Sequence, residues 1–181
     1  PAPYHDMYGP EDIIPVNRSH LERQDPHPLM AAYYDYRYGR AFSRDDVREA
    51  VIPAYMGLIT QIDDQIGRLM SYLKESGQIN DTMIVFTSDH GDYLGDHWMG
   101  EKELFHDASA RIPLIIVDPS EEADATRGSV SKSLTEAIDL LPTFLEFAGG
   151  EVPDHILEGH SLLPELYDAG QTPRDFVISE Y

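Results

Sequence analysis

The stretch Thr82-Met-Ile-Val-Phe-Thr-Ser-Asp-His-Gly-Asp92 decides the fold class of this chain. Its unbroken apolar middle predicts a short strand over residues 82–87 that is buried on both faces, as in a central parallel strand. Asp89 and His90 follow that strand directly. In open α/β sheets the functional groups gather beyond the carboxyl ends of the strands, so this pair is the first candidate for a site.

A long helix is predicted immediately before the strand. Ser43 and Asp46 form a capping-box-like start, and Gly77 is a suitable stop. Pro53 is expected to kink the helix or to split off its first turns, because proline removes a backbone donor. The order of helix and strand indicates an α/β protein. One helical face is apolar and comprises Val47, Val51, Tyr55, Leu58, Ile59, Ile62, Ile66, Leu69 and Leu73.

Further elements are predicted towards the end of the chain. Residues 112–117 have the composition of a second short buried strand, and residues 176–179 that of an edge strand. Ser133 with Glu136 forms another capping box, which predicts the start of a helix that Gly149 ends. Pro142 is expected to kink this helix.

Residues 1–42 are rich in Pro, His, Asp and Tyr without a sustained period, and they predict an irregular extended segment ahead of a domain over residues 43–181. Within it, residues 33–40 alternate aromatic rings with charges. Such a mixture is found at subunit interfaces and ligand pockets, which would allow a homo-oligomer, and also on plain amphipathic surfaces. The sequence leaves these alternatives open.

Composition narrows the classes of function. The 181 residues carry a formal net charge of −20, which disfavours nucleic acid and anionic membranes as partners. A bound divalent cation is the simplest way for such a chain to accept an anionic substrate. The chain has no cysteine, so any metal must be held by oxygen and nitrogen atoms. No apolar run approaches the roughly 20 residues that span a bilayer.

Asp89 and His90 have the chemistry of metal ligands. A carboxylate and a neutral imidazole suit manganese, zinc, iron or, with more oxygens, calcium, and Gly91 is expected to let the backbone turn so that both side chains reach one ion. An EF-hand is excluded because the nearby aspartates lack its spacing and closing Glu. The alternative, a capping Asp beside a hydrogen-bonded surface His, remains open.

A series of motifs carries a resemblance to a known family. Ser88-Asp-His-Gly-Asp-x-Leu-Gly-Asp-His97, Gly100-x-Lys102 and Arg111-Ile-Pro-Leu-Ile-Ile resemble, in that order, the C-terminal signature region of the sulfatase branch of the alkaline phosphatase superfamily. The series is especially similar to the phosphonate monoester hydrolases. The resemblance implies the C-terminal portion of an alkaline-phosphatase-like three-layer α/β/α sandwich, with residues 43–181 as the C-terminal part of the hydrolase domain.

The resemblance also implies roles for individual residues. Asp89 and His90 would be ligands of a divalent metal ion, with Mn, Ca and Zn not distinguished. Lys102 would be catalytic and substrate-binding, because its charge would contact the transferred sulfuryl or phosphoryl oxygens. His97 is assigned to substrate binding, with a supporting role away from the chemistry left open for it and for His106. Asp92 and Asp96 are interpreted as loop caps or as acceptors that support the site. Arg111 is interpreted as the residue that opens the second strand, with a contact to the substrate oxyanion as the alternative.

Departures from the family pattern limit what this chain can do by itself. The family's nucleophile is a formylglycine made from Cys or Ser in a Cys/Ser-x-Pro-x-Arg motif, and no such motif occurs here. The chain is therefore expected to be part of a longer enzyme, to need the missing N-terminal part with its formylglycine, and to be inactive alone. The implied activity is metal-dependent hydrolysis of anionic phosphonate, phosphate or sulfate esters.

Three alternatives to this function stay open. The first is an arylsulfatase, a choline-sulfatase-like enzyme or a phosphomutase of the same superfamily, and the identity of the upstream nucleophile would separate these. The second is a noncatalytic binding or assembly domain, which the absent nucleophile and the Tyr-rich segment would favour. The third is an acidic α/β domain in which Asp-His-Gly occurs by chance. The expected compartment is the cytoplasm, with the periplasm as the alternative.

Overall fold

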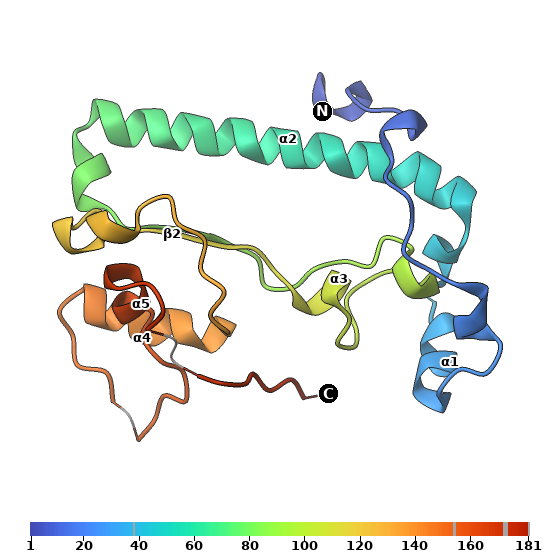
Figure 1. Ribbon diagram of the computed structural model, residues 1–181. Helices are drawn as coiled ribbons and strands as arrows, with labels where there is room; N and C mark the ends of the chain where they lie inside the picture. The colour runs from blue at the N-terminus through green and yellow to red at the C-terminus, as the bar shows by residue number, and fades with distance from the viewer. Residues whose placement is uncertain (38, 154, 172–173, 181) are drawn as a thin grey trace. The chain divides into compact units, whose positions relative to one another are not determined.

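A computed structural model describes residues 1–37, 39–153, 155–171 and 174–180 (Figure 1). Short 3₁₀ turns connect the elements. No helix in these ranges is long and apolar enough to cross a membrane. The helices and strands are α1 (Pro28–Tyr34), α2 (Asp45–Glu75), β1 (Ile84–Thr87), α3 (Asp107–Ala110), β2 (Leu114–Val117), α4 (Leu140–Phe147) and α5 (Leu163–Tyr167).

The chain forms two compact units. The first comprises Pro1–Ser76 and His90–Pro113, and the second comprises Gly77–Asp89 and Leu114–Tyr181. The chain passes from one to the other between Asp89 and His90. The predicted boundary at residue 43 stays a prediction, although the segment before it contains the helix α1 as well as irregular turns.

Helix α2 is the main element of the first unit. It begins at Asp45 with two acidic residues in its first turn, and their negative charges interact favourably with the positive end of the helix dipole. The predicted cap is wrong, because the Ser43 hydroxyl donates to Arg40 O instead. Pro53 does not split off the first turns, because α2 runs through it, with Ile52 and Gly57 buried on either side. The alternative, a kink at Pro53, stays a prediction. Gly77 ends the helix as predicted, with a left-handed φ of 76°.

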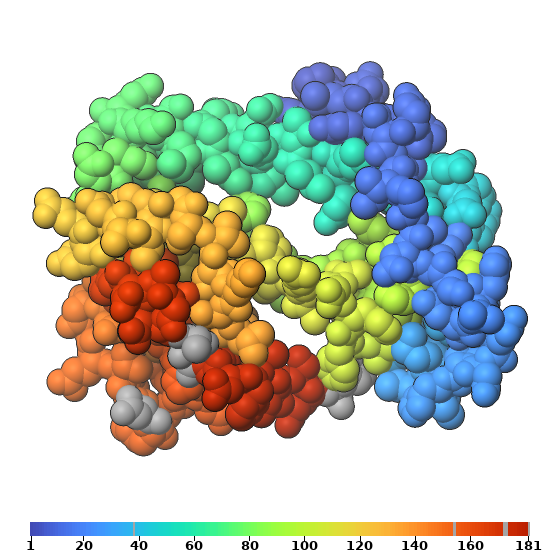
Figure 2. Space-filling view, in the orientation of Figure 1, coloured from blue at the N-terminus to red at the C-terminus, as the bar shows by residue number. Residues whose placement is uncertain are grey.

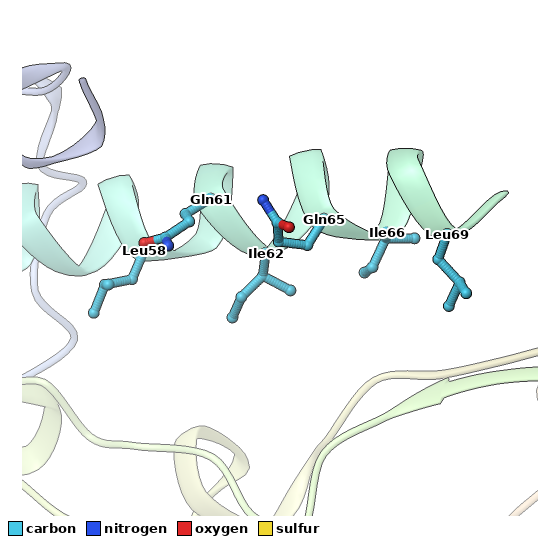
Figure 3. A pocket seen from close by; sticks show the side chains of 6 residues that line it. All are labelled: Leu58, Gln61, Ile62, Gln65, Ile66 and Leu69. Carbon is cyan, nitrogen blue, oxygen red and sulfur yellow. The ribbon is translucent and has the colours of Figure 1, made fainter. Parts of the chain in front are cut away.

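The N-terminal residues lie along α2. The Tyr4 hydroxyl donates to Asp64 over 2.7 Å, and the Tyr8 hydroxyl lies 2.7 Å from the Thr60 hydroxyl. In the space-filling view the first residues, in blue, cover part of the helix (Figure 2). The apolar side chains of Leu58, Ile62 and Leu69 extend from one side of the same helix (Figure 3).

The hydrophobic core of the first unit lies around one tryptophan. Trp98 is packed with Tyr93, Met99 and Leu104 from residues 90–113, and with Tyr34 from α1. The Trp98 indole donates to Ser19 O over 2.8 Å, and the Arg18 guanidinium lies 4.2 Å from the ring centroid. This core fastens residues 93–104 to the N-terminal segment.

Strands β1 and β2 pair in the second unit. They are antiparallel, with Ile84 opposite Val117 and Thr87 opposite Leu114. The prediction of a parallel strand buried on both faces is therefore wrong for this pair: Phe86 is 41% exposed and Ile115 is 58% exposed. An apolar run predicts a strand but does not give its direction or the number of covered faces.

Helix α4 starts later than the sequence predicts. A 3₁₀ turn, Ala137–Asp139, precedes it, and the Glu136 amide donates to Asp139 Oδ2 over 2.8 Å. Ser133 is therefore not the cap. Pro142 lies in the first turn of α4, where a proline costs no intrahelical bond, and Gly149 follows the helix with a left-handed φ of 74° as predicted. The predicted edge strand at residues 176–179 does not form.

Candidate active site

His90 and Lys102 form the centre of the candidate site. The Lys102 ammonium nitrogen lies 2.8 Å from His90 Nε2, and His90 Nδ1 lies 2.8 Å from the carbonyl oxygen of the next residue, Gly91. Both residues belong to the first unit. The structure thus brings together two of the residues that the sequence assigns to the site.

These two hydrogen bonds determine the protonation of the His90 ring. An ammonium group can only donate, so Nε2 must accept with its lone pair, and Nδ1 must carry the proton that is donated to Gly91 O. Metal-binding histidines have the same arrangement, with one ring N–H held by a backbone carbonyl and the other nitrogen free to coordinate. The ring of His90 is therefore in the tautomer that a metal ion needs.

Asp89 precedes His90 in the chain and belongs to the second unit. It is exposed, and its Oδ1 accepts a long hydrogen bond of 3.4 Å from the Ser88 hydroxyl. Within the residues that the structure describes, no group of three or more His, Asp or Glu side chains is arranged to hold a metal ion. Asp89 and His90 therefore stay predicted ligands, and a complete coordination sphere needs further donors.

The backbone that carries Lys102 has an unusual conformation. Five residues with side chains adopt a positive φ there, namely Leu94, His97, Trp98, Glu101 and Leu104. Each such residue costs about 1–3 kcal/mol, so the surrounding contacts must hold the loop in place. Strained backbone of this kind is concentrated at functional sites.

The two aspartates of this loop accept hydrogen bonds from backbone amides, Asp92 as a local cap and Asp96 as an acceptor for a distant segment. Asp92 accepts from the Leu94 amide over 2.9 Å, and Asp96 accepts from the Asn17 amide over 2.8 Å. Burial raises the pKa of the Asp92 carboxyl above its ordinary value. The Asp92 carboxylate thus holds the backbone of the loop, and the Asp96 carboxylate joins the loop to the N-terminal segment.

His97 and His106 form a stacked pair with ring centroids 4.1 Å apart. His97 Nδ1 lies 3.1 Å from a Glu22 carboxylate oxygen, and His106 Nδ1 lies 2.8 Å from the Tyr93 hydroxyl. Burial, followed by the neighbouring His97, lowers the pKa of His106, and burial raises the pKa of Tyr93 to about 12. The assignment of His97 to substrate binding stays a prediction, because these contacts are with the protein's own side chains.

Gly91 is required for a reason other than the predicted sharp turn. A Cβ at this position would lie 1.9 Å from the carbonyl oxygen of Ala108, which is far below a normal contact distance. The backbone after His90 therefore lies directly against α3. Arg111, after α3, is exposed, and its guanidinium lies 3.7 Å from the Asp107 carboxylate. Its role stays a prediction.

Sequence reasoning did not single out two residues near the site. Ser109 in α3 is buried and contacts the segments of both His90 and Lys102. Glu22 comes from the N-terminal segment and reaches His97 across 75 positions of sequence. The small residues on either side of Ser109, Ala108 and Ala110, are the sequence feature that could have indicated close packing there. No sequence pattern indicates a role for Glu22.

A family model described as Sulfatase matches residues 19–150 of the chain. This match includes β1, the loop of residues 94–104 and α4. The chain belongs to the sulfatase family. The predicted membership in the sulfatase branch of the alkaline phosphatase superfamily is thereby confirmed.

The relatives of this sulfatase-family chain are named as different kinds of protein. It is 42% identical over 177 residues to the multifunctional alkaline phosphatase superfamily protein PehA of Trinickia caryophylli, with 91% of this chain and 34% of that protein covered. It is 34% identical over 191 residues to an arylsulfatase of Clostridium perfringens, with 100% of this chain and 37% of that protein covered. The chain thus spans about a third of the length of these relatives.

A solved structure gives the fold. The crystal structure of the phosphonate monoester hydrolase of Agrobacterium radiobacter matches with a TM-score of 0.83 and 34% sequence identity, covering 98% of this chain and 36% of that protein. The predicted fold class, an alkaline-phosphatase-like α/β fold of which this chain is a part, is confirmed by this match.

Proposed function

We propose that this chain supplies part of the active site of a metal-dependent hydrolase that cleaves anionic phosphonate, phosphate or sulfate esters. In this proposal Asp89 and His90 are metal ligands, and Lys102 binds the oxygens of the transferred group. The observation that carries the proposal is the 2.8 Å contact between His90 Nε2 and the Lys102 ammonium. It places a potential metal ligand and a cation, the two groups that an anionic ester needs, beside each other.

The residues fit a divalent cation in their chemistry. His90 presents the lone pair of Nε2, with its other ring nitrogen held by Gly91 O, and Asp89 adds a negative oxygen ligand. A bound metal ion would supply Lewis-acid chemistry, stabilising charge and lowering the pKa of an attacking oxygen. The remaining ligands would have to come from the part of the family's length that this chain does not span.

Lys102 would change partner during the reaction. One lone pair on Nε2 cannot serve a metal ion and an ammonium together, so the Lys102 ammonium would leave His90 when the site is loaded. The side chain is exposed and would then pair with the anionic substrate, where its positive charge stabilises the charge that develops in the transition state.

The preferred substrates in this proposal are phosphonate or phosphate monoesters. The similarity to a phosphonate monoester hydrolase supports this preference, and the similarity to an arylsulfatase supports sulfate esters as the alternative. All of them present a tetrahedral anionic centre, which the same cations can recognise. The nucleophile would be a formylglycine outside these 181 residues. The cytoplasm remains the proposed compartment.

Lys102→Ala in the full-length enzyme tests the proposal. Turnover of a phosphonate monoester should fall by about 100–1,000-fold, because a charge aimed at the transition state is removed. The rate is measured against phosphonate, phosphate and sulfate esters, and the preferred ester identifies the substrate class.

Lys74→Ala is the matched control, because Lys74 is an exposed lysine in the last turn of α2. Its turnover should equal that of the unmodified enzyme. If Lys102→Ala and Lys74→Ala had the same unchanged rate on every ester, Lys102 would have no part in the chemistry and the proposal would fail.

A further inference from the structure

Ser109 joins the two segments that carry the candidate site. It is 5% exposed and lies in α3, a single helical turn. Its carbonyl oxygen accepts a 2.7 Å hydrogen bond from the Gly91 amide, and its hydroxyl donates to the carbonyl oxygen of Lys102. One buried residue therefore holds both the backbone beside His90 and the backbone of Lys102.

The first of these contacts, from the Gly91 amide to the Ser109 carbonyl oxygen, restrains the backbone beside His90. The position of a Cβ on Gly91 would be only 3.3 Å from the Ser109 Cα, in addition to its clash with Ala108 O. The backbone at Gly91 consequently has no room to approach α3 further, and the amide bond to Ser109 keeps it from moving away. His90 is thus attached to a backbone whose distance from Ser109 is set from both sides.

The second contact, from the Ser109 hydroxyl, is needed to position Lys102. A lysine side chain is a flexible four-carbon stem with a point charge at its end, so it does not set its own location. Its backbone lies in the loop whose residues Glu101 and Leu104 have φ values of 63° and 73°. Such a backbone relaxes when a contact that holds it is lost. The Ser109 hydroxyl is a contact of this kind, made directly to the Lys102 carbonyl.

We infer that Ser109 is a positioning residue that sets the separation of His90 and Lys102 by holding the Lys102 carbonyl with its hydroxyl. This inference rests on the proposed function, and Ser109 acts through Lys102 rather than on the substrate. Loss of the hydroxyl moves the ammonium away from the site that it shares with His90. A catalytic group displaced by about 1 Å can cost about 100-fold in rate.

Two variants of the full-length enzyme test the inference. Ser109→Ala removes the hydroxyl, and Ser109→Cys keeps nearly the same volume but has only a weak S–H donor. Both should lower kcat by about 10–100-fold with KM little changed, because the misplaced charge acts mainly in the transition state. Circular dichroism and the melting temperature establish that each variant is folded.

A double substitution separates positioning from general stability. When Lys102→Ala is already present, Ser109→Ala should lower kcat no further, because the group that it positions is gone. A residue that only stabilised the fold would lower activity in both backgrounds. Ser71→Ala is the control: it removes a hydroxyl-to-carbonyl bond of 3.0 Å from the exposed surface of α2 and should leave kcat unchanged.

Every outcome decides between the two proposals. Unchanged kcat in folded Ser109→Ala or Ser109→Cys, while Lys102→Ala is strongly impaired, overturns the role of Ser109 and leaves the proposed function intact. Unchanged kcat in Lys102→Ala overturns the proposed function itself. If neither Ser109 variant folds, Ser109 serves the fold alone and the inference is wrong.

Discussion

At the scale of single residues, the stacked imidazoles predict how stability depends on pH. Burial and His97 hold the pKa of His106 below its ordinary value of 6.5. The unfolded chain therefore binds a proton on His106 more readily than the folded chain does. This contribution to the free energy of unfolding is fully present at a pH above the ordinary pKa of His106. It is lost as the pH falls below that value towards the lowered pKa of the folded state, with a slope of at most about 1.4 kcal/mol per pH unit.

Removal of His106 tests this sign. His106→Gln keeps a polar partner for Tyr93 but does not titrate, so the fall in the urea midpoint between about pH 7.5 and pH 5.5 should be smaller than in the unmodified chain. Trp98 is the only tryptophan of the chain and lies in the same core, so its fluorescence reports on this unit. His155→Gln, at an exposed histidine, should keep the original dependence. A steeper fall of the urea midpoint in His106→Gln than in the unmodified chain would contradict the predicted sign.

The residues of the site could be predicted only where a motif names them. The resemblance of the motifs predicts His90 and Lys102 as site residues, and the structure adds that their side chains are in contact. Ser109 and Glu22 could not be found this way, because their importance comes from contacts across the fold. A buried serine leaves no charge or periodicity in the sequence, and a pairing 75 residues apart has no spacing rule.

At the scale of elements, two glycines of α2 should respond oppositely to the same substitution. Alanine in place of glycine inside a helix stabilises it by about 0.5–1 kcal/mol. A Cβ at Gly67 meets nothing within 4 Å, whereas a Cβ at Gly57 would lie 1.9 Å from Tyr4 O. Gly67→Ala should raise the melting temperature, and Gly57→Ala should detach the N-terminal turn from the helix.

Hydrogen exchange measures the detachment. Faster exchange at residues 4–12 is expected in Gly57→Ala and not in its control, Gly67→Ala. Equal protection of these residues in both variants would mean that the turn does not lie on α2 as the contacts of Tyr4 and Tyr8 indicate.

The elements themselves were predictable where their signals are local. Helix α2 follows from its apolar period, and its end follows from the φ that only Gly77 takes easily. The start of the helix was misplaced by one residue, because the Ser43 side chain bonds to Arg40 and Arg44 is the N-cap instead. The direction of β2 was not predictable, since pairing depends on the route of the chain between the strands and not on their composition.

At the scale of the whole molecule, the chain spans about a third of the length of its relatives. We predict that residues 1–181 alone hydrolyse none of the esters, because the proposed nucleophile and further metal ligands lie outside them. Metal binding, measured by calorimetry, should be weak for the same reason. Measurable turnover by this polypeptide, or a tight one-to-one metal complex, would contradict the division of the site.

The left-handed residues at positions 94–104 also bear on attempts to move this site to another scaffold. A synthetic peptide of the motif and loop alone would relax to ordinary backbone angles, because its shape is imposed by the segment around Trp98. A designer would have to graft residues 17–23 and Tyr34 together with the loop. The transplantable unit is an assembly of distant segments, although the family signature occupies one continuous stretch.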